Sequence, residues 1–144
     1  MYSHKKNELL YFGLFLIFAI ALLHISALNN YYYWIYSWFD LLVHFLGGMW
    51  VAVMALWIYF FSGLFRKPKM SKVIIFWLSF LAVLSTSLLW EIYEVNIWRH
   101  LSEPDFIVDT ITDTLAALAG SYMAYTYFSE SYKNLMSNEN GESR

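Results

Sequence analysis

The sequence contains no cysteine, and charged residues make up only 14% of its 144 positions. Without cysteine, the chain has no disulfide framework, no thiolate metal site and no cysteine nucleophile. A soluble domain of this length carries far more charge, because its surface must face water. Hydrophobic residues instead account for 60% of the chain and aromatic residues for 22%. This composition indicates that the bilayer is the solvent of the folded protein.

Further absences narrow the function classes. No basic patch and no glycine-rich phosphate loop is present, so nucleic-acid or nucleotide binding has no support. The HExxH zinc motif is missing, and the serines show no recognisable triad pattern. The pair Asp109 and Asp113 echoes part of the acidic motif of CDP-alcohol phosphotransferases, but the companion D-G-x2-A-R element is absent. Whether the protein is an enzyme therefore stays open.

Four segments are long and apolar enough to span a membrane, which takes about 20 residues per helix. We predict an all-α, polytopic membrane protein whose single transmembrane domain covers residues 1–129 as a four-helix bundle. The expected helices cover about 8–28, 39–61, 72–98 and 105–128. Residues 130–144 are polar and are expected to form a disordered cytoplasmic tail.

The basic residues predict the orientation of these spans. With four spans, nearly all of them fall on one side of the membrane, and only Arg99 falls on the other. Those on the rich side are Lys5, Lys6, Arg66, Lys67, Lys69, Lys72, Lys133 and Arg144. The positive-inside rule makes this side cytoplasmic, so both termini are predicted to be inside. The aromatic segment 29–38 then lies outside and suits the interfacial aromatic belt.

The ionisable residues within the spans are grouped rather than scattered. They form three pairs with i,i+3 or i,i+4 spacing, which places both members of a pair on one helix face. The pairs are Asp40 with His44, Glu91 with Glu94, and Asp109 with Asp113. At about 1.5 Å per residue, all of them lie within roughly 15 Å of the outer boundary. The sequence therefore predicts an acidic pocket that opens outward.

Small residues continue these faces into the membrane. Gly47 follows His44, and Gly120 follows Asp113. Small residues allow helices to approach closely in lipid, so we expect a tight bundle below the pocket. His24, near the outer end of the first span, is expected to be hydrated rather than part of the pocket.

Five carboxylates with one histidine make an unbalanced set of charges. Two ionised carboxylates about 5 Å apart repel by about 3 kcal/mol at an effective dielectric constant of 20. Protons, a metal ion or a cationic group of a ligand must compensate. Carboxylates with one imidazole suit Mg²⁺, Mn²⁺, Fe²⁺ or Zn²⁺. We predict that a divalent metal ion is bound among the six residues, without dividing them between direct ligands and outer-shell partners, and that Glu94 serves as general base. The predicted metal-site residues are Asp40, His44, Glu91, Glu94, Asp109 and Asp113.

The order of these motifs carries a family resemblance. The pattern D-x3-H followed by glycine, then E-x2-E, then D-x3-D, falls within residues 39–121 and resembles the YjdF-type bacterial inner-membrane proteins. More distantly, the chain looks like the VanZ-like family, which is associated with teicoplanin resistance. In that family Asp113 would correspond to an asparagine and Glu94 to a glutamine, so the sequence departs from it there. The resemblance implies a multi-pass protein of the bacterial cytoplasmic membrane and no defined activity.

The leading hypothesis is a metal-binding envelope protein that acts on a lipid or lipid-linked substrate at the outer leaflet. Membrane lipid is then its expected partner. One rival is a proton- or cation-coupled transporter that uses the same acids as carriers. The inner halves of the second and fourth spans are nearly free of ionisable groups, which disfavours a polar path across the membrane. The other rival is a structural protein whose cluster only ties the helices together.

Overall fold

The computed structural model describes residues 2–65, 70–97 and 106–133, and the regular structure in these ranges is helical. The prediction of an all-α fold is confirmed for this part of the chain. A short helix and four long ones follow each other along the chain. They are α1 (Tyr2–Asn30), α2 (Tyr32–Ile35), α3 (Ser37–Phe61), α4 (Lys72–Ile97) and α5 (Phe106–Ser131).

The long helices extend past several of the expected limits. α1 begins at Tyr2 instead of near residue 8, and α5 continues to Ser131 instead of ending near 128. Hydropathy marks the part of a helix that suits lipid, whereas hydrogen bonding can continue into polar turns beyond it. The tail expected from residue 130 therefore begins inside a helix. Its remaining residues, 134–144, lie outside the described part of the chain.

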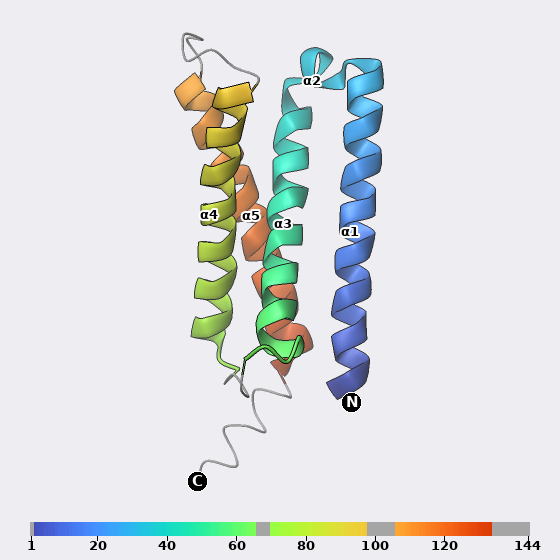
Figure 1. Ribbon diagram of the computed structural model, residues 1–144, viewed down its shortest axis with the longest axis vertical. Coiled ribbons are helices and arrows are strands. Elements are labelled where there is room, and N and C mark those ends of the chain that lie inside the picture. Colours follow the sequence, from blue (N-terminus) through green and yellow to red (C-terminus); the bar gives the residue numbers. More distant parts are fainter. Residues whose placement is uncertain (1, 66–69, 98–105, 134–144) are drawn as a thin grey trace.

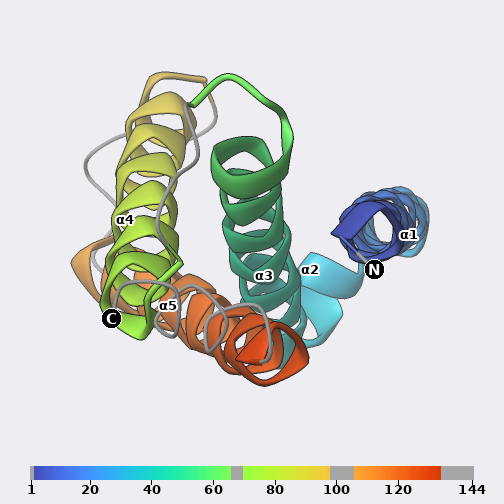
Figure 2. The same cartoon turned by 90° about the horizontal axis from the view of Figure 1, so that it is seen from below.

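The long helices run alternately up and down (Figure 1). The start of α1 and the end of α5 lie at one end of the bundle, here called the terminal end. α2, the start of α3, the end of α4 and the start of α5 lie at the other, here called the α2 end. Viewed along the bundle, α3 lies between α1 and α4 (Figure 2). Helix α3 contacts all three other long helices and packs most extensively against α5.

Burial differs from that of a soluble bundle, because many large apolar side chains outside the apolar core are exposed while several polar side chains are buried. Phe18 is 63% exposed and Leu89 is 67% exposed, whereas Ser79, Ser121 and Asp113 are buried. Lipid solvates such apolar side chains, and it offers no partner to polar groups, which turn inward. By length and composition, α1, α3 and α4 each contain a candidate membrane span. The fold is thus that of a membrane protein.

The turn between α1 and α3 depends on one unusual backbone conformation. Tyr31 has φ 59° and ψ 30°, in the left-handed region, and it separates the end of α1 from α2. The carbonyl of Tyr31 accepts hydrogen bonds from the backbone N–H groups of Trp34 and Ile35. Exposed Tyr31, Trp34 and Trp38 gather at this end of the bundle. Asp40 follows the turn directly, so the turn decides where α3 and its first acidic residue begin.

The terminal end is fastened by contacts between α1 and the end of α5. The Tyr132 hydroxyl donates a hydrogen bond to the carbonyl of Lys5 over 2.7 Å. The Lys5 ammonium donates in return to the carbonyl of Ser131 and lies 5.1 Å from the centre of the Tyr132 ring. Burial, with the neighbouring Tyr127 and Glu8, raises the pKa of Tyr132 above its usual range. The phenol therefore stays protonated and able to donate.

Replacing Tyr132 with phenylalanine should lower the stability of the protein by about 1 kcal/mol, the usual value of one hydrogen bond. The ring and its stacking on Phe128, with 4.2 Å between ring centroids, would be kept. The apparent melting temperature in detergent measures the effect. Tyr122→Phe, which removes the hydroxyl of an exposed tyrosine of α5, is the matched control and should change little. Equal melting temperatures for the two variants would contradict the assignment.

Candidate functional site

Two of the predicted site residues lie on consecutive turns at the start of α3. Asp40 is in the first turn of the helix, and His44 follows at i,i+4 on the same face. The imidazole Nε2 of His44 lies 3.6 Å from Oδ1 of Asp40. The Asp40 side chain is 33% exposed, whereas that of His44 is 14% exposed. Asp40 thus forms the open edge of the pair.

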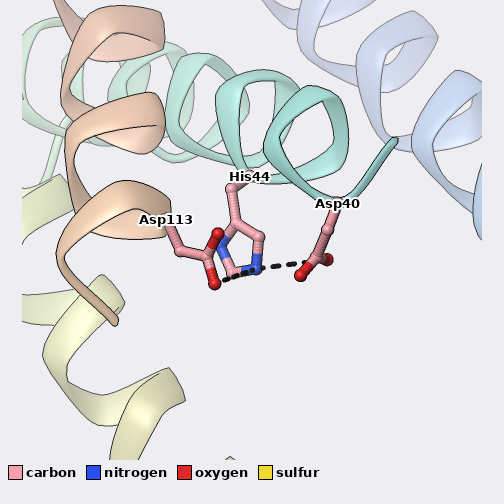
Figure 3. A group of neighbouring side chains, drawn as sticks. All are labelled: Asp40, His44 and Asp113. Atoms are coloured by element: carbon pink, nitrogen blue, oxygen red, sulfur yellow. Dashed lines mark ion pairs between the residues drawn. The ribbon is translucent and has the colours of Figure 1, made fainter. Parts of the chain in front are cut away.

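Asp113 of α5 completes a group of three (Figure 3). Its Oδ2 lies 3.6 Å from the same Nε2 atom of His44, and the residue is 1% exposed. One ligand atom from each of Asp40, His44 and Asp113 lies within 4.8 Å of the other two. We call these residues the Asp–His–Asp group. Their arrangement could hold a metal ion, with Asp113 on the buried side and Asp40 on the open side.

The group forms because α3 and α5 approach each other unusually closely one turn further along. A Cβ added to Gly48 would lie 2.1 Å from the carbonyl oxygen of Ala117. A Cβ added to Gly120 would lie 2.0 Å from the carbonyl oxygen of Phe45. Gly48 follows His44 by four residues, and Ala117 follows Asp113 by four. The same helix faces therefore carry the close contact and the polar group.

The close approach differs in one position from the expectation. A Cβ added to Gly47 would meet no atom within 4 Å, so Gly48 and not Gly47 is the contact residue of the pair. Successive residues of an α-helix point about 100° apart, so neighbouring glycines face different directions. Gly120, expected from its spacing to Asp113, does take part in the contact.

Glu91 is near the same end of the bundle but has a different partner. It is 6% exposed on α4, and its Oε2 accepts a hydrogen bond of 2.8 Å from the Thr110 hydroxyl of α5. Glu91 does not belong to the group of three. Sequence reasoning missed Thr110, although its i,i+3 spacing to Asp113 was a usable signal.

The other predicted residues are placed less closely or not at all. Asp109 is in the first turn of α5, outside the Asp–His–Asp group. The side chain of Glu94 lies outside the described residues, so its role as a base stays a prediction. His24 is exposed on α1, and its Nδ1 lies 2.7 Å from the Tyr33 hydroxyl. That contact joins α1 to α2 and leaves His24 apart from the site.

The sequence was also compared with known proteins. A family model described as "Predicted membrane protein (DUF2238)" matches residues 2–134. No curated protein and no solved structure gave a significant match. The family match covers nearly the whole chain, and the chain belongs to this family of predicted membrane proteins.

Proposed function

We propose that this member of the family spans the membrane four times and binds one divalent metal ion through Asp40, His44 and Asp113, near the outer face. The observation that carries the proposal is the position of one imidazole nitrogen 3.6 Å from a carboxylate oxygen on each side. The bound ion would act on a lipid or lipid-linked envelope substrate.

The distances fit a shared ion better than direct hydrogen bonds. A hydrogen bond from an imidazole N–H to oxygen spans about 2.7–3.2 Å, and Nε2 carries a single proton at most. Two ligand atoms at about 2.1 Å from a tetrahedral ion lie about 3.4 Å apart. The observed 3.6 Å separations are within a few tenths of an ångström of that value. The three ligand atoms lie within 4.8 Å of one another, so the carboxylates would move closer together on binding an ion.

The charge of the group supports the same reading. Two carboxylates, one of them 1% exposed, face a single imidazole in a bundle solvated by lipid. Charges at such depth are costly unless they are compensated. A divalent cation neutralises both carboxylates. The mixed oxygen and nitrogen donor set suits Mn²⁺, Fe²⁺ or Zn²⁺. It suits Mg²⁺ less well, because Mg²⁺ prefers oxygen ligands to imidazole.

The four-span topology is supported by the two faces of α5. This helix falls outside the three candidate spans found by composition. Its polar Asp113, Ser121 and Ser129 are nevertheless buried, whereas Ile107 and Met123 face outward. At 26 residues it is about 39 Å long, enough to cross a hydrocarbon core of about 30 Å. We therefore propose that α5, which packs along α3, is the fourth membrane span.

The orientation rests on the basic residues. Lys5 is near the start of α1, Lys72 begins α4, and Lys133 follows α5. The start of α1, the start of α4 and the end of α5 lie at the terminal end, which the positive-inside rule assigns to the cytoplasm. The Asp–His–Asp group then lies near the outer face, beside the exposed aromatic residues of the turn between α1 and α3. From the resemblance to YjdF-type proteins, we propose that the protein is located in the bacterial cytoplasmic membrane.

The open side of the group suggests how a substrate would reach the ion. Three protein ligands leave coordination positions for water or substrate, as in catalytic metal sites. These positions would lie toward Asp40, whose side chain is 33% exposed, and not toward buried Asp113. A metal there would activate water or bind phosphate oxygens of a lipid headgroup.

Elemental analysis of the detergent-purified protein tests the proposal. Wild type should contain about one divalent metal ion per chain, and Asp40→Asn and Asp113→Asn should contain almost none while remaining folded. Asp109→Asn is the matched control: it removes a carboxylate from the same helix but outside the group, and should keep the metal. Folded wild type that neither contains nor is stabilised by any added ion would overturn the proposal.

The same distances also fit the rival hypothesis of a structural protein whose acidic cluster only ties the helices together. Direct contact of His44 with Asp113 would tie α3 to α5 without any ion. This rival predicts that wild type contains no metal. It also predicts that Asp40→Asn and Asp113→Asn are less stable than Asp109→Asn.

A further inference from the structure

Near its start, helix α5 makes a polar contact with α4 and another with α3, and the second belongs to the Asp–His–Asp group. Thr110 donates to Oε2 of Glu91 on α4, and Asp113, three residues later, faces His44 on α3. Residues three apart on a helix have Cβ atoms about 5–6 Å apart. The Glu91–Thr110 hydrogen bond therefore lies one turn from a proposed metal ligand.

The first turn of α5 exposes large apolar side chains. Ile107 is 69% exposed and Val108 is 63% exposed, so their side chains face away from the bundle. The close backbone contact at Gly48 and Ala117 lies beyond Asp113, toward the terminal end. Asp113 thus lies between the glycine contact on one side and the Glu91–Thr110 hydrogen bond on the other.

Glu91 itself accepts a hydrogen bond from another helix. It is buried on α4, it receives the Thr110 hydroxyl, and it lies outside the group whose atoms are within 4.8 Å of one another. We infer that Glu91 is a positioning residue, which holds the start of α5 through Thr110 so that Asp113 meets the metal ion, and is not itself a ligand. This inference rests on the proposed metal site.

Substitutions that keep or remove the hydrogen bond separate positioning from ligation. Glu91→Gln keeps a carbonyl oxygen that can accept from Thr110 but replaces the carboxylate with a weak ligand. Its metal affinity should stay within about threefold of wild type. Glu91→Ala and Thr110→Val remove the bond and should weaken affinity roughly tenfold, as outer-shell changes do. Thr110→Ser keeps a hydroxyl and should restore most of that loss.

The experiment measures the dissociation constant of Mn²⁺ and of Zn²⁺ for the full-length protein in detergent, by competition with a chelating dye. Melting temperatures are recorded for every variant. Tyr132→Phe, which removes a hydrogen bond at the terminal end, is the stability control. It should lower the melting temperature without changing metal affinity, which separates positioning from general loss of stability.

Three results would overturn the inference, and they differ from one another. If wild type binds the metal and Glu91→Gln loses it as completely as Asp113→Asn does, then Glu91 is a ligand. Unchanged affinity in Thr110→Val would make the hydrogen bond irrelevant to the site. Absence of metal from folded wild type would remove the proposed function itself, and the inference with it.

Discussion

Gly48→Ala should abolish the proposed metal binding and lower the stability of the protein by about 3 kcal/mol, near the upper end for overpacked sites. The added Cβ would lie 2.1 Å from the carbonyl oxygen of Ala117, which is backbone and cannot rotate away. Helices α3 and α5 must then separate by about 1.3 Å or more to restore ordinary contact. Metal sites tolerate distance errors of about 0.2 Å, so His44 and Asp113, one turn away, could no longer share an ion.

Gly47→Ala is the matched control for this prediction. It makes the same chemical change one residue earlier, where an added Cβ meets nothing within 4 Å. Alanine is the better helix former by about 1 kcal/mol, so this variant should be at least as stable as wild type and keep its metal. The melting temperature and the metal content are measured for both variants. Similar behaviour of Gly47→Ala and Gly48→Ala would mean that α3 and α5 do not meet as described.

His44→Leu is expected to have the second large effect. The substitution leaves Asp40 and Asp113 facing an apolar side chain in place of the imidazole that now lies 3.6 Å from each of them, and it removes a ligand of the proposed metal ion. Removing one partner of a buried charge pair costs about 3–5 kcal/mol, because the remaining charge is uncompensated. Metal binding should be lost, and the melting temperature should fall by more than in Tyr132→Phe.

A second substitution makes this prediction specific. Adding Asp113→Asn to His44→Leu removes the most buried carboxylate, and should recover part of the lost stability while leaving the metal absent. Adding Asp109→Asn instead should recover none, because Asp109 lies outside the group. A double variant His44→Leu with Asp113→Asn that is less stable than His44→Leu alone would show that Asp113 does not depend on His44 for compensation.

Much of the fold and part of the site could be predicted from local features of the sequence. Apolar runs predicted the long helices, because apolar length is what a bilayer selects. The i,i+4 spacing of Asp40 and His44 predicted their common face, which is a property of a single helix. Helix ends were predicted less well, since Tyr2 and Ser131 extend helices through polar turns that carry no hydropathy signal.

Residue contacts between helices could not be read from the sequence. The spacing rules grouped the six ionisable residues by depth, and depth alone does not say which way each helix face points. Only Asp40, His44 and Asp113 gather in the part of the chain that the structure describes, whereas Glu91 turns to Thr110. His24, similarly, contacts Tyr33 of the adjoining turn.

The sequence by itself determined the helical class of this protein and its family's membrane character, and it predicted that the acidic residues lie near one end of the bundle, because apolar length and rise per residue are enough for each. The tertiary structure decided which acidic residues meet. That choice depends on the rotation of each helix about its axis, and for α3 and α5 the rotation is set where Gly48 and Gly120 let two backbones touch. A rotation of about 100°, the angle between neighbouring residues, would bring a different face of α3 to α5.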